Sequence, residues 1–146
     1  MFGGHYVKKL VYLSVLFIGL VSLSACGSKS LDEVLTGEWS YNFDLKSEDI
    51  DDEVEKGNLT FYNNGEVEIA PSDDTYYYKG SYKISDNTLT IEYEVNDTGL
   101  MIGRYYKIDV DEIKAESLTG SISSNRKING NPYGTLEGNA TLNKEK

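Results

Sequence analysis

Two groups of carboxylates come nearest to a catalytic arrangement in this sequence. Glu92 and Glu94 alternate along one segment, and three further acids lie within 109–112. Glycoside hydrolysis needs two acids that face one cleft, about 5–10 Å apart. The alternation instead puts Glu92 and Glu94 on the outward face of a strand, beside Lys79 and Lys83. We therefore interpret these glutamates as members of surface ion pairs.

Aromatic residues form the candidate ligand-binding set. Tyrosine combines a large apolar ring with a polar tip, which suits the wall of a pocket or an interface. Strands also favour aromatic residues, so the same rings can simply fill a core. Tyr77 and Tyr105 have outward parity and are candidates for an interface. The candidates on the apparent inner face are Trp39, Tyr76, Tyr78, Tyr82, Tyr93 and Tyr106.

Arg104 shares the parity of Ile102, Tyr106 and Ile108, which points it inward. A buried guanidinium needs a carboxylate or carbonyl partner. Inside a barrel it would be placed to meet the acid group of a fatty-acid-like ligand, so it joins the candidate ligand-binding residues. The alternative is a bulge at Gly103 that reverses the parity and leaves Arg104 in water.

The acidic run over 48–55 holds six carboxylates. Such a run attracts Ca²⁺ when its ligands alternate around a central glycine, as in an EF-hand loop. This run has neither the alternating Asp or Asn ligands nor the glycine, so we interpret it as a solvated charge run.

Cys26, the single cysteine, ends a segment with the layout of an export signal. Lys8 and Lys9 precede an apolar stretch, and Leu23-Ser24-Ala25 supplies small residues before the cysteine. The apolar stretch is shorter than the roughly 20 residues that cross a bilayer. This layout resembles the signal of bacterial lipoproteins. The resemblance implies cleavage after residue 25, lipidation of the Cys26 sulfur and anchoring at the outer face of a bacterial membrane.

Loss of that signal would remove much of the chain's chemistry. The single histidine, His5, would leave with it, and acylation would use the single thiol. The mature domain would then lack the side chains of Ser-His-Asp and Cys-His catalysis and the usual zinc ligands. We expect no enzyme, no metal and no cofactor, with a carboxylate enzyme as the remaining catalytic alternative.

The charge of the mature chain also limits its partners. Of 14 basic residues, Lys8 and Lys9 belong to the signal, and the remaining 12 face 24 acidic residues, a formal charge of −12. Phosphate backbones are bound by clustered Lys and Arg, so we expect no nucleic-acid partner. The same charge opposes adsorption to anionic lipid, which leaves the anchor at Cys26 as the expected membrane contact.

Alternation of apolar and polar residues dominates the rest of the chain. Ser30-Leu31-Asp32-Glu33 matches a capping box and predicts a short helix over 31–36, ended by Gly37. About eight strands follow, joined mostly by short turns such as Asn63-Asn64-Gly65. Residues 46–57 fit either a short amphipathic helix or a loop. The pattern is that of an antiparallel meander, closed into a barrel or folded into two packed sheets.

The segment Leu35-Thr36-Gly37-Glu38-Trp39 resembles the Gly-x-Trp signature that opens the first strand of lipocalins and bacterial lipocalin-like domains. Residues 80–84 and 87–91 look like the middle hairpin of the bacterial domains, so the likeness covers roughly 31–110. It implies an all-β, up-and-down barrel of about eight strands, whose interior can hold one small apolar ligand.

One lipocalin feature has no match. Lipocalins often place an arginine of a late strand over the signature tryptophan, whereas Arg104 and Arg126 lie in no clear equivalent of that strand. The expected divisions are a signal over 1–25, a lipidated linker over 26–30 and a barrel over 31–146. We expect a binding module for a small apolar ligand. The alternative is a surface interaction or structural protein with a solid core and an extracytoplasmic protein partner.

Overall fold

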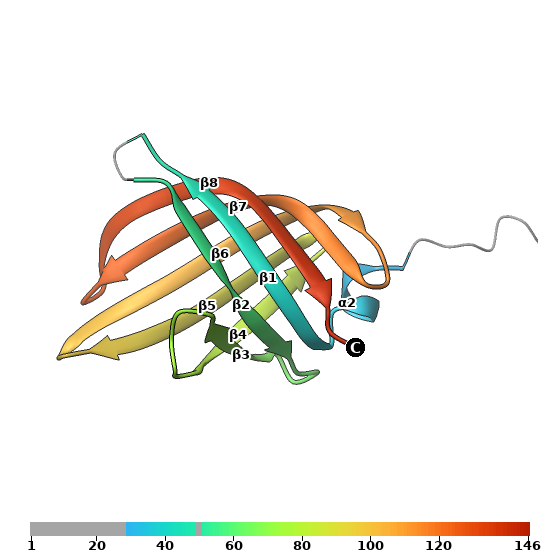
Figure 1. Cartoon of the computed structure of the whole chain (residues 1–146), viewed down its shortest axis with the longest axis horizontal. Helices are drawn as coiled ribbons and strands as arrows, with labels where there is room; N and C mark the ends of the chain where they lie inside the picture. The colour runs from blue at the N-terminus through green and yellow to red at the C-terminus, as the bar shows by residue number, and fades with distance from the viewer. Residues whose placement is uncertain (1–28, 49–50) are drawn as a thin grey trace, which may run out of the picture.

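The computed structural model describes residues 29–48 and 51–146, and these form a closed antiparallel barrel (Figure 1). The predicted signal over 1–25 and Cys26 lie outside the described residues. Each strand pairs with the next one along the chain, and the first also pairs with the last. The strands are β1 (Gly37–Lys46), β2 (Glu53–Phe61), β3 (Glu66–Pro71), β4 (Tyr78–Ser85), β5 (Thr88–Asp97), β6 (Leu100–Ile113), β7 (Ser117–Ile128) and β8 (Asn131–Lys144).

Pairing of β1 with β8 closes the sheet, from Trp39 opposite Lys144 to Lys46 opposite Glu137. Closure leaves no unpaired sheet edge to aggregate with another chain. The prediction of an all-β, up-and-down barrel of about eight strands is therefore confirmed. The Asn- and Gly-rich segment 125–134 belongs mostly to β7 and β8 and turns at 129–130.

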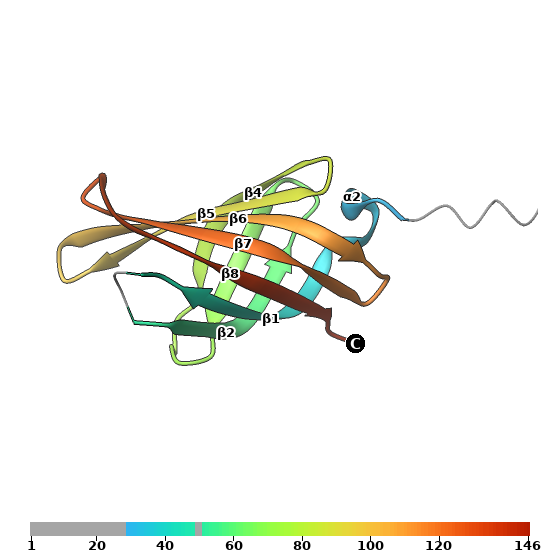
Figure 2. The ribbon, with the colours of Figure 1, turned by 90° about the horizontal axis from the view of Figure 1, so that it is seen from above.

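A short helix, α2 (Leu31–Val34), covers one end of the barrel. The predicted capping box is present, because the backbone N–H of Ser30 donates to the Glu33 carboxylate at 3.1 Å. Leu31 and Val34 are buried against the barrel. The helix ends earlier than the predicted 31–36, and Gly37 has a φ of +120° where the chain turns into β1. Figures 1 and 2 show α2 at the same end as the C-terminus.

Residues 53–57 correct the expectation of a helix or loop over 46–57. They extend β2 as a regular strand in which Glu53 lies opposite Leu45 and Glu55 opposite Phe43. Strand pairing overrides the polar composition here because residues 53–57 all pair with β1 along one edge, and β3 pairs with the other edge from Gly57 onward.

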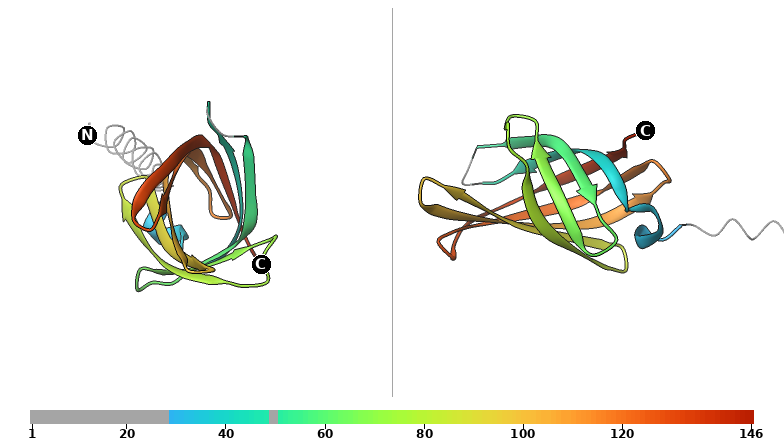
Figure 3. Two further views of the ribbon diagram at one scale, coloured as in Figure 1. Left: turned by 90° about the vertical axis from the view of Figure 1, so that its left-hand side faces the viewer. Right: turned by 90° about the horizontal axis from the view of Figure 1, so that it is seen from below.

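The buried core fills the half of the barrel next to α2. Its largest fully buried side chains are Trp39, Phe43 and Phe61. The hairpins β1–β2, β5–β6 and β7–β8 lie at the opposite end of the barrel. The left view of Figure 3 looks at this end and shows the strands as a ring. In the described residues, no helix has the length and apolar character needed to cross a bilayer.

A lysine of the last strand lies over the buried tryptophan of the first strand. The Nζ atom of Lys144 lies 5.2 Å from the centroid of the Trp39 ring and donates a hydrogen bond of 2.9 Å to the Val34 carbonyl. The indole Nε1 donates to the Leu35 carbonyl at 2.6 Å. These contacts join α2 to both β1 and β8, and α2 is thereby held over this end of the barrel.

Candidate ligand-binding cavity

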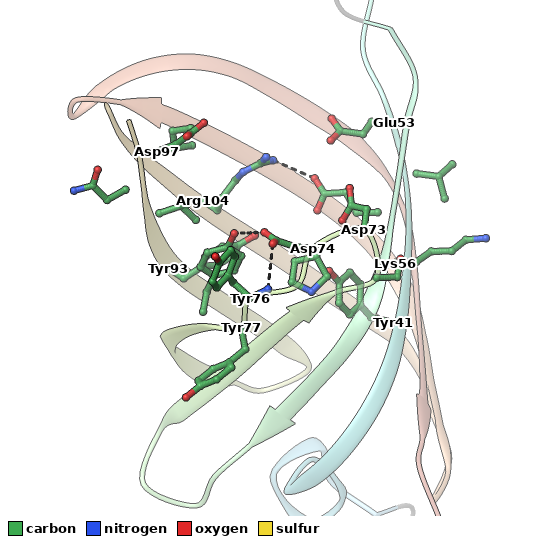
Figure 4. Close-up of a pocket in the computed structure, with 18 residues that line it drawn as sticks. Tyr41, Glu53, Lys56, Asp73, Asp74, Tyr76, Tyr77, Tyr93, Asp97 and Arg104 are labelled. Carbon is green, nitrogen blue, oxygen red and sulfur yellow. Dashed lines mark hydrogen bonds and ion pairs between the residues drawn. The ribbon is translucent and has the colours of Figure 1, made fainter. Parts of the chain in front are cut away.

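A cavity of about 830 Å³ opens at the end of the barrel away from α2 (Figure 4). Ligand cavities in proteins span about 300–1,000 Å³, so this one has room for a small molecule. It is enclosed by the ends of β2, β5 and β6 and by the segment between β3 and β4. Side chains that face into it include Tyr41, Glu53, Glu55, Asp73, Asp74, Tyr78, Tyr93, Val95, Ile102 and Arg104.

Stacked tyrosines from three neighbouring strands form one side of the cavity and its base. The ring of Tyr78 in β4 stacks on Tyr93 in β5, with centroids 5.8 Å apart and planes at 23°. Tyr93 stacks in turn on Tyr106 in β6, at 6.1 Å and the same angle. Alternation along each strand points all three rings inward. The hydroxyl of Tyr78 donates to the Asp74 carboxylate, which holds its ring against the loop.

A network of charged side chains crosses the lumen and borders the cavity. The carboxylate of Glu55 in β2 accepts hydrogen bonds of 3.1 Å from Arg104 in β6 and from Arg126 in β7. It also accepts one of 2.5 Å from the Tyr106 hydroxyl. Glu53 pairs with Arg126 as well. Because β2 lies across the ring from β6 and β7, these bonds brace opposite walls.

This network corrects our interpretation of the acidic run as wholly solvated. Glu53 and Glu55 share the inward parity of Leu59 and Phe61, and the Glu55 side chain is only 14% exposed. A buried carboxylate requires a partner, and the two arginines supply it. The apolar alternation of the sequence ends at Leu59, because positions 53, 55 and 57 are Glu, Glu and Gly and the outward Val54 is apolar, so only the parity of Leu59 and Phe61 indicates this face.

Arg104 points inward, as one of our two alternatives held. The pairing of β5 with β6 runs through Gly103 without a bulge, and the register shifts of the barrel lie at 110–112 and 126–127. The guanidinium partner is Glu55 of the protein itself. Arg104 lines the cavity, but its charge is already paired.

The other predicted ligand-binding residues divide by their position along the barrel. Tyr78 and Tyr93 line the cavity, and Tyr106 lies behind them with its hydroxyl on Glu55. Tyr76 was placed wrongly on a strand, because it precedes β4 and is 72% exposed at the rim of the cavity. Pro71 ends β3 and the following polar segment carries Tyr76 out of the sheet.

Trp39 and Tyr82 lie away from the cavity. Trp39 is fully buried next to α2. Tyr82 packs edge-on against Phe61 at 5.1 Å and donates a 2.5 Å hydrogen bond to the Tyr62 carbonyl. Both side chains face inward as expected, but they belong to the packed half of the barrel.

Tyr41 is a cavity residue that our candidate set missed. Its inward parity on β1 was evident, but it seemed to belong with the core residues around it. The centroids of the Tyr41 and Phe43 rings lie 4.6 Å apart. Tyr41 is 6% exposed, and it borders the cavity.

The carboxylate groups considered first for catalysis do not meet in a cleft. Glu92 and Glu94 are exposed on the outer face of β5, and Lys79 pairs with Glu68 of β3 at 4.0 Å. Asp109 accepts hydrogen bonds from Thr88 and Lys107. Among the described residues, no group of three or more His, Cys, Asp or Glu side chains is arranged to hold a metal ion.

Four tyrosines of this region have a pKa above the ordinary value of a tyrosine. Burial raises the pKa of Tyr41, Tyr93 and Tyr106, and the hydrogen bond to Asp74 raises the pKa of Tyr78 to about 12. An unfolded tyrosine titrates near pH 10. As the pH rises past that value the unfolded chain loses protons first, so this contribution to stability is complete below about pH 10 and is lost above it.

We therefore expect tyrosinate absorbance and unfolding to rise together in alkali. Absorbance near 295 nm and far-ultraviolet circular dichroism, followed from about pH 9 to 12.5, should show some tyrosines ionising only as the barrel unfolds. Reversible ionisation of every tyrosine near pH 10, with the dichroism unchanged, would contradict the burial of these rings.

The fold and the cavity together define a closed, eight-stranded, up-and-down barrel with a packed end and an open end. Comparisons of the chain with protein families, with curated proteins and with solved structures found no match.

Proposed function

We propose that this protein is a lipid-anchored, lipocalin-like binding module that holds a small ligand with an apolar body in the cavity of its barrel. The observation that carries the proposal is the cavity of about 830 Å³, lined at its base by stacked tyrosines. Val95 and Ile102 add apolar surface beside the rings.

The position of α2 supports an anchored arrangement with the cavity facing away from lipid. Cys26 precedes Leu31 by five residues, which reach about 17 Å at most when extended. An acylated Cys26 would hold the α2 end near the membrane, while the cavity opens at the other end. Repulsion between the acidic domain and anionic lipid favours the same orientation.

Replacement of Cys26 by serine should release the protein from membranes. The hydroxyl cannot take the place of the thiol in thioether formation. Labelling with an alkynyl fatty acid should therefore disappear, and the variant should no longer be found in the membrane fraction that holds the lipidated wild type. Serine at position 28, Ser28→Ala, is the matched control and should leave labelling unchanged. Equal fatty-acid labelling of the Cys26→Ser variant would contradict the anchor.

Binding in the cavity can be tested with diphenylhexatriene, a neutral apolar probe that fluoresces when it leaves water. Wild type should bind one probe per barrel. Val95→Trp fills the cavity and should weaken binding by about tenfold or more, since a blocked pocket loses its apolar contact. Leu100→Trp places the same side chain on the exposed β5–β6 hairpin and should bind as wild type does. Equal binding by the two variants, or none by wild type, would contradict the proposal.

The alternative is a protein that acts through its outer surface. A hollow of about 950 Å³ crosses the outer face of β4 to β8, and Tyr105 and Tyr133 border it. Tyr133 is 64% exposed. Exposed aromatic rings are frequent at protein interfaces. Two results together would favour this alternative. Wild type would capture a membrane protein that Tyr133→Ser does not capture, and no probe would bind in the barrel.

A further inference from the structure

We propose that the cavity selects ligands that carry a positive charge, an amine or quaternary ammonium group attached to an apolar body. This inference rests on the proposed binding function and names the class of ligand. It follows from three features of the cavity: unpaired carboxylates at its rim, a tyrosine ring face in its wall and one tyrosine hydroxyl that has no hydrogen bond to the described residues.

The unpaired charges of the cavity are negative. Glu53 and Glu55 are neutralised by the arginines beneath them. Asp73 and Asp97 also line the cavity, and their carboxylates form no hydrogen bond or ion pair within the described part of the chain. Lys56 belongs to the same rim, but its side chain is exposed and points away from the cavity (Figure 4).

The tyrosine wall offers an aromatic ring face to an organic cation. The ring face of an aromatic residue is negative, and quaternary ammonium groups bind in cages of such faces. Tyr93 is stacked between Tyr78 and Tyr106, so the ring face that this stack leaves uncovered is that of Tyr78, at its end. Tyr76 adds a further ring at the rim.

Tyr41 supplies an acceptor within the same space. More than nine-tenths of its surface is buried, it lines the cavity, and its hydroxyl has no hydrogen-bond partner among the described residues. The hydroxyl is not among the fully buried atoms that lack a partner, so it is open to the cavity and can accept a hydrogen bond from a ligand there. An ammonium N–H or a ligand hydroxyl would donate that bond.

An anionic ligand is disfavoured by the same contacts. Arg104 lines the cavity, but Glu55 already takes its guanidinium at 3.1 Å. An incoming carboxylate would have to displace Glu55 from two arginines and from the Tyr106 hydroxyl. The fatty-acid-like ligand that Arg104 suggested in the sequence therefore has no free cation to meet.

The experiment compares three probes that share one apolar body. Diphenylhexatriene is neutral, its trimethylammonium derivative is a cation and its propionate derivative is an anion. The cation should bind at least about tenfold more tightly than the neutral parent, and the anion most weakly. Raising the salt concentration should narrow the difference, because both unpaired carboxylates are exposed at the rim.

Charge-matched variants separate the cavity from the general acidity of the domain. Asp73→Asn with Asp97→Asn should weaken the cation by about fivefold to tenfold and leave the neutral probe unchanged. Glu92→Gln with Glu94→Gln removes the same charge from the outer face of β5 and should change neither. If the neutral or anionic probe binds as tightly as the cation, the inference is wrong while the binding function stands. If no probe binds, both are wrong.

Discussion

Trp39→Ala should lower the free energy of unfolding by about 3–5 kcal/mol, the cost of deleting a large buried aromatic side chain. The ring is fully buried at the packed end of the barrel. Its Nε1 donates a hydrogen bond of 2.6 Å to the Leu35 carbonyl, and the Lys144 ammonium lies over its ring face. The substitution therefore leaves a void between α2, β1 and β8 and removes the partner of a buried carbonyl at the same time.

Urea denaturation followed by far-ultraviolet circular dichroism measures this loss. Trp39→Phe should cost less, because phenylalanine retains much of the buried ring and loses mainly the hydrogen bond. Tyr133→Ala removes an exposed ring and should stay within about 0.5 kcal/mol of wild type. A Trp39→Ala midpoint equal to that of wild type would remove this residue from the core and contradict the packed end.

Glu55→Gln should destabilise the barrel by about 3 kcal/mol, since it breaks a largely buried ion pair by removing one partner. Among the described residues, Glu55 is the carboxylate bonded to Arg104, whereas Arg126 retains Glu53. The neutral amide keeps the shape of the side chain, so the loss reports the uncompensated charge of Arg104. It also weakens the hydrogen bond from Tyr106.

A double substitution distinguishes charge from packing. Glu55→Met with Arg104→Met removes both charges and should recover part of the stability lost in Glu55→Gln, because apolar replacements of a buried pair are often neutral. Glu112→Gln is the surface control; its partner Lys114 lies 3.0 Å away in water, and the change should stay within about 0.5 kcal/mol. Equal stabilities of Glu55→Gln and Glu112→Gln in urea would show that the network contributes nothing.

Much of the fold could be predicted because strand alternation is local. Inward and outward residues were assigned from parity alone, and the β4–β5 and β5–β6 registers agree with those assignments. The capping box at Ser30 and the turn at Gly65 are also local signals, and both appear in the structure. Closure was less evident, since the contact of β1 with β8 joins residues about a hundred positions apart.

The candidate site was harder to predict because parity says which face a residue occupies and not which end of the barrel. Trp39 and Tyr93 both face inward, yet one lies in the packed half and the other in the cavity wall. The inward position of two charged residues was hard to predict for a related reason. Glu53 and Glu55 face inward because arginines from distant strands neutralise them, and no local pattern records that pairing.

The central claim is that the barrel holds a small ligand in its cavity, and native mass spectrometry tests it most directly. The lipidated mature protein would be extracted in mild detergent from the membranes in which it is made. Wild type and Leu100→Trp should each carry one small molecule per chain, and Val95→Trp should carry none. A wild-type protein that leaves its own membranes with an empty barrel, at the same ligand-free mass as Val95→Trp, would contradict the account.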